Sequence, residues 1–223
     1  MRRTAAIVMV AVVGFGVAAC GSSKGSASSA DTQAPATTTA APTSAPTEAQ
    51  LNQLVLTAAQ VGSGWTASPI DDGGSSALPA CLSELEGSSQ NGPQGQGQFD
   101  QADGGYFFES VGYAGPDTIA TEFANVKSTL DGCHDVSIQT SGTTVTGTMQ
   151  PVALTAGDMS AGYQLTFTGA AGQTLNMYVG VVGVNGYELS TAVGSMTGAD
   201  PSTFDALTAQ AVAKIKSGGG QSA

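Results

Sequence analysis

His134 is the residue of this chain best suited by type to acid–base chemistry, and it is the only histidine among the 223 residues. A general base needs an orienting partner and a nucleophile within hydrogen-bond reach. The histidine directly follows Cys133, and no serine between residues 51 and 217 lies in a GxSxG nucleophile elbow. The pattern favours a surface histidine beside a disulfide, and we expect no catalytic residue.

Acidic residues occur in pairs that could bind a hard cation or hydrolyse a glycosidic bond. The chain has no twelve-residue EF-hand spacing, no Gly-Asp repeat and no phosphate-binding loop, and nothing selects one pair of carboxylates over another. We therefore interpret these residues as solvated surface charges and expect no metal and no other cofactor. The pairs are Asp71 with Asp72, Glu84 with Glu86, Asp100 with Asp103, and Asp131 with Asp135.

Cys20 ends an uncharged apolar run that follows Arg2 and Arg3. As a helix, residues 5–19 would span about 22 Å of a hydrocarbon core that is roughly 30 Å thick, which suits a signal peptide. The sequence Val17-Ala18-Ala19-Cys20 resembles a lipobox, and the resemblance implies diacylation of the Cys20 thiol and cleavage before it. We expect residues 1–19 to be a lipoprotein signal peptide. The protein would then be exported and anchored to the outer face of the cytoplasmic membrane or cell envelope.

Once Cys20 is assigned to lipid, Cys81 and Cys133 remain as an even pair. In an exported protein such a pair indicates a disulfide. Bridging the two residues would close a loop of about 52 residues, for which chain entropy gives roughly 4 kcal/mol of stabilisation. A redox or metal-binding pair is the alternative, but neither cysteine lies in a CxxC motif.

The charge balance limits the partners of the chain. It holds 17 acidic and 6 basic residues, and loss of Arg2 and Arg3 with the signal peptide takes the net charge from -11 to -13. Nucleic acid is excluded as an expected partner because phosphate binding needs clustered Lys and Arg. Attachment to the membrane is expected through the two acyl chains on Cys20, which suffice without basic residues.

Residues 20–50 are predicted to be a lipidated cysteine followed by a disordered tether. From Gly21 to Gln50 the segment is rich in Ser, Thr, Ala, Gly and Pro and has no branched aliphatic or aromatic residue, so it cannot bury a core. Residues 51–217 are predicted to form a single domain, since their number suits one hydrophobic core. Residues 218–223 are predicted to be a disordered tail.

Several local signals place helices in the predicted domain. A short helix is expected near Leu51, with capping-box spacing at Thr57 to Gln60 and an extended segment after it. A second short helix is predicted from Pro79 to Leu85, and a long loop from Ser88 to Gly104. Two amphipathic helices complete the set. One follows Gly115-Pro116-Asp117 with a stripe of Ile119, Phe123, Val126 and Leu130, and the other runs from Pro201 to Lys216.

Alternating apolar residues and turn signals predict the strands. The sequence Asn185-Gly186 between two apolar runs indicates a hairpin with a type I′ turn. Together the elements predict an α+β fold, an antiparallel sheet of about five to seven strands with helices packed mainly on one face. The strands are expected at residues 106–113, 136–140, 143–152, 163–168, 175–184 and 187–193.

Tyrosines on the predicted strands are the candidate ligand-binding residues. A tyrosine offers an apolar ring and a polar hydroxyl, which suits the wall of a binding cleft. We expect a ligand site on the sheet surface near Tyr106, Tyr113, Tyr163 and Tyr178, under the loop from Ser88 to Gly104, since loops on a rigid scaffold often carry function.

The order of several features resembles that of actinobacterial sensor-domain lipoproteins. These are similar to the extracellular domain of PknH-type mycobacterial serine/threonine kinases. The resemblance covers residues 51–216 and implies an α+β fold and binding of an extracytoplasmic ligand, with no set of functional residues to transfer. The features that carry it are residues 54–65 (LVLTAAQVGSGW), Cys81, the Phe123 helix ending in Cys133, residues 156–163 (AGDMSAGY) and the last amphipathic helix.

The sequence therefore favours a lipid-anchored extracytoplasmic ligand-binding or sensor-like domain without catalytic activity. The expected partners are the membrane, through the anchor, and a small-molecule, lipid or glycan ligand or an envelope protein. An envelope protein-interaction or scaffolding module is the first alternative and predicts an exposed apolar patch. A cell-envelope hydrolase is the second, and it requires two carboxylates about 5 to 9.5 Å apart in a cleft.

Overall fold

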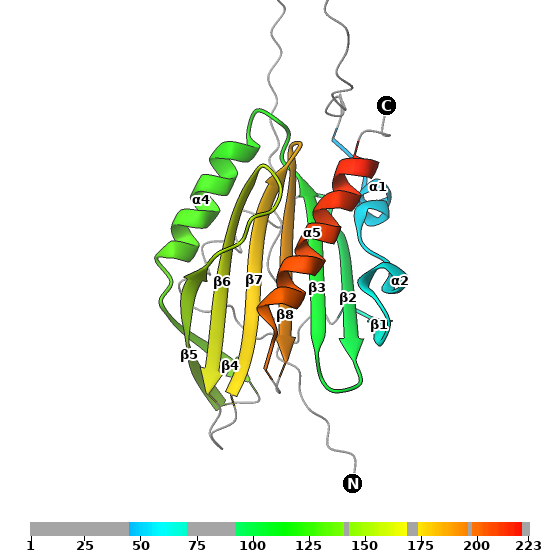
Figure 1. Ribbon diagram of the computed structural model, residues 1–223. Coiled ribbons are helices and arrows are strands. Elements are labelled where there is room, and N and C mark those ends of the chain that lie inside the picture. Colours follow the sequence, from blue (N-terminus) through cyan, green and yellow to red (C-terminus); the bar gives the residue numbers. More distant parts are fainter. Residues whose placement is uncertain (1–44, 71–91, 141–142, 169–173, 196–197, 220–223) are drawn as a thin grey trace, which may run out of the picture.

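The computed structural model describes residues 45–70, 92–140, 143–168, 174–195 and 198–219, which form one antiparallel sheet with helices on both of its faces (Figure 1). No helix among these residues is long and apolar enough to cross a membrane. Some predicted features lie outside the described residues. They are the signal peptide, Cys20, most of the tether, the end of the tail, and the helix from Pro79 to Leu85 with Cys81.

Eight strands make up the sheet in the order β1-β2-β3-β8-β7-β6-β5-β4, and every neighbouring pair is antiparallel. The α+β class is confirmed, whereas the number of strands exceeds the predicted five to seven. The strands are β1 (Trp65–Ser68), β2 (Gly95–Gln101), β3 (Tyr106–Tyr113), β4 (Asp135–Thr140), β5 (Thr143–Val152), β6 (Met159–Thr168), β7 (Thr174–Val184) and β8 (Tyr187–Ser195).

Strand β2 lies in the segment that composition predicted to be a loop, from Ser88 to Gly104. The glycines of β2 lie where another segment of the chain approaches the strand closely, and they do not mark turns. A Cβ atom at Gly97 would lie 2.6 Å from Cγ1 of Val55, and one at Gly95 would clash with the backbone of Leu51. Glycine inside a strand often marks a site where another chain segment packs closely. The prediction of a loop was wrong because the sequence alone does not show this neighbour.

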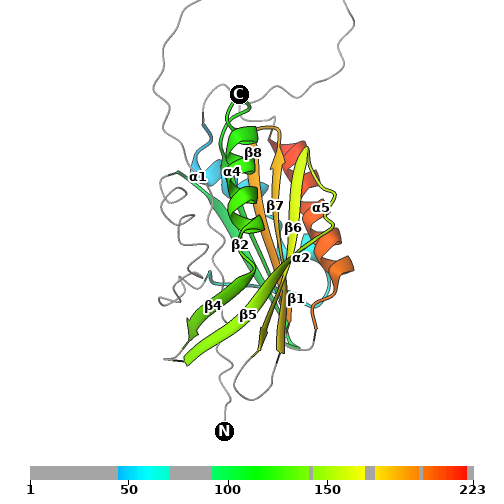
Figure 2. The same ribbon diagram turned by 90° about the vertical axis from the view of Figure 1, so that its left-hand side faces the viewer.

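The helices cover both faces of the sheet, as the side view in Figure 2 shows. Helices α1 (Glu48–Leu54), α2 (Ala58–Val61) and α5 (Pro201–Gly218) share one hydrophobic core, and we call this side the α5 face. Helix α4 (Ile119–Asp131) shares a second core on the opposite side, the α4 face. The prediction that the helices pack mainly on one face was therefore wrong for α4.

The sequence of β3 explains why two layers of helices are needed. Successive side chains of a strand point to opposite faces. Tyr106 and Phe108 accordingly lie in the core of the α4 face, while Phe107 and Val111 lie in that of the α5 face. Because both sides of the central strands are apolar, both must be buried.

Local sequence signals fix several elements as expected. Thr57 forms the predicted capping box with Gln60 at the start of α2, and Thr47 forms a second one, which was not predicted, with Gln50 at the start of α1. Helix α1 thus begins inside the predicted tether. The hairpin of β7 and β8 turns at Asn185, with φ of 51°, and at Gly186, with φ of 80°, which are the positive angles of a type I′ turn.

Candidate functional site

The structure does not bring the four predicted ligand-binding tyrosines together. Tyr106 and Tyr163 are 3% and 1% exposed and belong to the core of the α4 face. Tyr178 is 8% exposed in the opposite core and stacks on Phe204, and Tyr113 packs against that same core. Burial raises the pKa of Tyr106 and of Tyr163 well above its usual value. These side chains form parts of two cores and no common ligand surface.

The other candidate residues lie near the end of α4. Cys133 is 1% exposed, and its predicted partner Cys81 lies outside the described residues, so the Cys81 to Cys133 bridge stays a prediction. His134 follows as an exposed residue. Asp131 forms an ion pair with Lys127 and accepts a 2.9 Å hydrogen bond from the Tyr163 hydroxyl, which together hold the pKa of this carboxyl below its usual value. In the described part of the chain, no three His, Cys, Asp or Glu residues are grouped to hold a metal.

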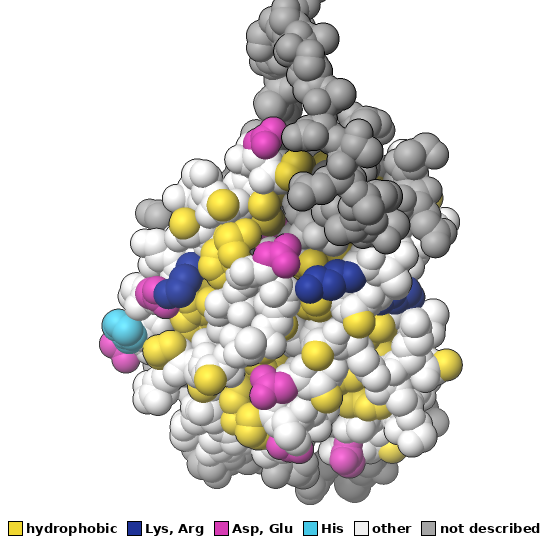
Figure 3. Space-filling view, turned by 45° about the horizontal axis from the view of Figure 1, so that its top comes forward, with side chains coloured by type: hydrophobic (Ala, Val, Ile, Leu, Met, Phe, Trp, Pro, Cys, Tyr) yellow, Lys and Arg dark blue, Asp and Glu magenta, His cyan; other side chains and the backbone are white. Residues whose placement is uncertain are grey.

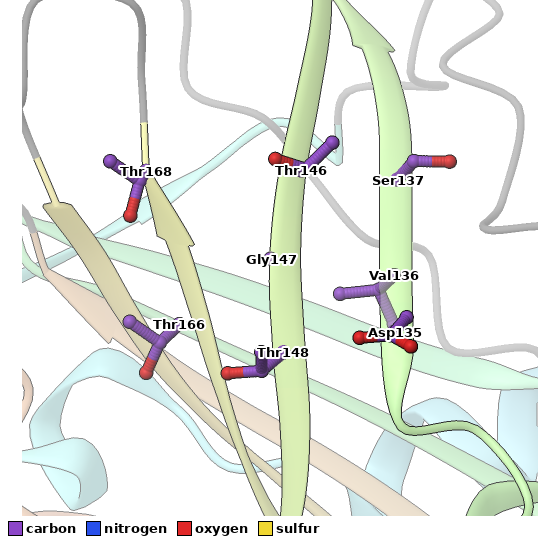
Figure 4. A pocket seen from close by; sticks show the side chains of 8 residues that line it. All are labelled: Asp135, Val136, Ser137, Thr146, Gly147, Thr148, Thr166 and Thr168. Atoms are coloured by element: carbon purple, nitrogen blue, oxygen red, sulfur yellow. The ribbon is translucent and has the colours of Figure 1, made fainter.

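A cavity of about 500 Å³ lies on the sheet where β4, β5 and β6 run side by side (Figure 4). Its walls carry hydroxyl groups. Thr148 is exposed, and the Thr166 hydroxyl donates a 3.2 Å hydrogen bond to Oδ1 of Asn176. Solvent-facing or paired hydroxyls need no ligand, so this cavity is the weaker of two candidate sites. The lining residues are Asp135, Val136, Ser137, Thr146, Gly147, Thr148, Thr166 and Thr168.

The stronger candidate is a group of polar side chains on the α4 face, beside the core that α4 covers. Gln96 of β2, Ser110 of β3 and Ser190 of β8 are direct cross-strand neighbours in one row. Ser110 and Ser190 are each 1% exposed. Gln98, two residues along β2 from Gln96, therefore points to the same face, and it is 6% exposed. We call these four residues, together with Glu122 of α4, the buried polar cluster.

Glu122 joins this cluster because of its position on α4. The helix lies over β7, with β6 and β8 on its two sides. Lys127 and Asp131 lie on the flank that meets Tyr163 of β6, and at 100° per residue Glu122 lies on the opposite flank, toward β8. Ile119 packs at Gly183, which pairs with Glu188. Three residues later, Glu122 is about 4.5 Å further along the helix axis, near the level of Ser190.

Some polar atoms of the cluster are paired, and others are buried without a partner. Oε1 of Gln94 accepts a 3.0 Å hydrogen bond from Nε2 of Gln96 and a 3.4 Å hydrogen bond from the Ser110 hydroxyl. The Ser190 hydroxyl, Oε1 of Gln98 and both carboxyl oxygens of Glu122 are shielded from solvent and have no hydrogen-bond partner. Burial raises the pKa of Glu122 above its usual value.

Unpaired buried atoms of this kind are costly, about 1–3 kcal/mol each. Such groups are rare in folded proteins, and each calls for a partner such as a water, an ion or a ligand. Several at one place indicate a site whose partner is supplied from outside the described chain. Sequence reasoning missed the cluster because Ser and Gln in strands resemble a solvent-facing pattern. Each serine lies beside polar and apolar residues of its strand, so no local signal in the sequence marks the cluster.

Glu109 is a buried carboxyl on the opposite side of the sheet from Glu122. It is 0% exposed on the α5 face, where one oxygen accepts a hydrogen bond from the Leu56 backbone N–H and Oε2 has no partner. Burial raises its pKa to about 7, although the Leu56 hydrogen bond and the charge of Lys214 both oppose the rise. It lies beneath the helices α1 and α5 and outside the buried polar cluster.

Comparison with known proteins identifies the fold. No protein-family model and no curated protein sequence matches the chain. Among solved structures, the extracellular domain of PknH from Mycobacterium tuberculosis superposes with a TM-score of 0.60 at 14% identity, over 78% of this chain and 98% of that one. An uncharacterised protein from Mycobacterium smegmatis, an Rv0999 ortholog, gives a TM-score of 0.46 at 14% identity, over 77% and 97% of the two chains. The structural likeness agrees with the resemblance read from the sequence, and this chain has the fold of the PknH extracellular domain.

Proposed function

We propose that this protein is a lipid-anchored extracytoplasmic domain without catalytic activity, and that it binds a ligand at the buried polar cluster. The fold is shared with a domain that is extracellular in its own protein. The lipobox-like sequence ending at Cys20 supports the same location. In a sensor-like role, the domain would signal whether this ligand is bound.

The observation that carries the proposal is the set of buried, unpartnered atoms on Ser190, Gln98 and Glu122. The hydroxyl groups of the cavity on β4, β5 and β6 face solvent or are already paired, so this cavity is a weaker candidate for ligand binding. The interaction-module alternative requires an exposed apolar patch, and in the described residues Ile70, at 37% exposure, is the single exposed large hydrophobic side chain. The cluster therefore favours a small ligand over a flat protein interface.

Substitution at the cluster tests this proposal. The purified exported protein is screened by thermal shift against trehalose, N-acetylglucosamine and 1,6-diaminohexane, as neutral and cationic probes. At least one probe is expected to raise the melting temperature of wild type, because a ligand that binds only the folded state stabilises it. Ser190→Val, which replaces the unpartnered hydroxyl with a methyl group, should abolish that rise.

Thr148→Val is the matched control, since it removes an exposed hydroxyl from the cavity on β5. It should leave the shift intact. Gln98→Leu provides a second cluster variant in case Ser190→Val folds poorly. The proposal fails if no probe stabilises the wild type, or if the cluster variants and the control respond equally.

Anchoring is tested separately from binding. Cys20→Ala should move the protein from the membrane fraction to the soluble fraction, because the diacylated thiol is the proposed attachment. An unchanged distribution between the fractions would refute lipid anchoring and leave the binding proposal standing.

A further inference from the structure

The unpartnered atoms of the buried polar cluster are mostly hydrogen-bond acceptors. Oε1 of Gln98 and the two carboxylate oxygens of Glu122 accept only, while the Ser190 hydroxyl can donate or accept. A ligand that satisfies this cluster must therefore supply N–H or O–H donors. A ligand that offered only acceptors, such as a phosphate or a carboxylate, would leave these atoms unpaired and would meet the charge of Glu122.

Charge narrows the choice of donors. Among the described residues the lysines are Lys127, Lys214 and Lys216, and there is no arginine. Lys127 lies on the far flank of α4 in its ion pair with Asp131, and the other two lie on α5, across the sheet. The face in Figure 3 likewise shows its basic side chains singly and in no patch. Glu122 therefore has no basic side chain of the described chain beside it, and a positively charged donor fits best.

The described side chains of the cluster fit an ammonium group better than a metal ion. Metal sites for hard cations use several oxygen ligands, most of them carboxylates. The part of the chain that the structure describes has no group of three potential metal ligands. An ammonium group needs only one carboxylate and a neighbouring oxygen acceptor, which is what Glu122 and Ser190 provide.

The spacing of the acceptors sets the size of the ligand. Ser190 and the β2 residues are separated by two strand intervals, which is about 10 Å. One small cation cannot reach across this distance, so a second donor group is needed at the end of a short spacer.

We infer that the buried polar cluster binds an organic ammonium compound, with its charged nitrogen against Glu122 and Ser190 and a second donor group at Gln98. This inference rests on the proposed function and names the ligand class for the same site.

Two probes of equal length separate charge from shape. 1,6-Diaminohexane carries an ammonium at each end and 1,6-hexanediol carries neutral hydroxyls, and each is titrated by calorimetry into the purified exported protein. The diamine is expected to bind at least tenfold more tightly than the diol.

Variants assign the effect to Glu122. Glu122→Gln keeps the size of the side chain and should weaken diamine binding about tenfold while leaving any diol binding unchanged, since a charge-assisted hydrogen bond becomes a neutral one. Glu48→Gln, the same change at an exposed position of α1, is the control and should alter neither affinity.

Each outcome separates the inference from the proposed function. If the diol or trehalose binds as tightly as the diamine, and Ser190→Val abolishes that binding, the site stands and the ammonium assignment is overturned. If diamine binding is unaffected by Glu122→Gln, the assignment is again overturned. If no probe binds and a crystal structure shows only ordered water on Ser190 and Gln98, both the inference and the proposed function fall.

Discussion

The buried carboxyl of Glu109 should make the stability of this protein depend on pH in a predictable way. Its pKa is raised from 4.5 to about 7 by burial. The folded state therefore holds the proton more tightly than the unfolded state does. The contribution of the protonated Glu109 to the free energy of unfolding is fully present below pH 4.5. It is lost progressively as the pH rises toward the folded-state pKa, and above that pKa no more is lost. The difference between the two values corresponds to about 3 kcal/mol of free energy of unfolding.

Glu109→Gln removes the ionisation and keeps a side-chain oxygen that can accept the hydrogen bond from the Leu56 N–H. The free energy of unfolding of this variant is measured by urea denaturation at pH 4.5, 6, 7 and 8, beside wild type. The advantage of the variant over wild type should widen by about 3 kcal/mol between pH 4.5 and pH 8. Glu48→Gln, at an exposed carboxyl, should run parallel to wild type. Parallel curves for Glu109→Gln would show that Glu109 ionises with an ordinary pKa and would refute the reasoning.

Three further predictions concern packing, the hairpin turn and the cysteines. Gly180→Ala should lower the free energy of unfolding by about 1–3 kcal/mol, because the new methyl would lie 2.9 Å from the Phe204 ring; an unchanged urea midpoint would show that α5 shifts freely. Asn185→Ala should cost about 1 kcal/mol by the same assay, since alanine tolerates positive φ less well than asparagine; equal midpoints would contradict this. Reduction with dithiothreitol should lower the melting temperature if Cys81 and Cys133 are bridged, and two free thiols by titration before reduction would remove the bridge.

Much of the fold could be predicted from local patterns. Strand β3 and the turn at Asn185 depend on alternation and on backbone angles, which neighbouring residues decide, so both were predicted where the structure has them. Strand β2 could not be recognised, since Gly95 and Gly97 resemble turn residues until α1 is placed beside them. The side of the sheet on which α4 packs could not be predicted either, because an apolar stripe fits either face of the central strands.

The candidate site was harder to predict than the fold. Tyrosines such as Tyr163 are a residue type common in binding surfaces. Their rings are also among the largest side chains that fill the core of this protein, and they are buried there. Ser110 and Ser190 become neighbours only through the pairing of β3 with β8. A site assembled from strands that are distant in the chain has no local spacing to reveal it.

The pairing of β3 with β8 also determines the order in which the molecule can be assembled. The chain makes β1 to β3 as one antiparallel meander and β4 to β8 as another, and the two are joined in the sheet only where β8 meets β3. The paired residues lie between 74 and 88 positions apart in the chain, so we expect this contact to form late in folding. Until residues 187–195 are present, the first three strands have no partner beyond β3. Until then the outer edge of β3 is an unpaired strand edge, and such an edge can pair with another chain and start aggregation.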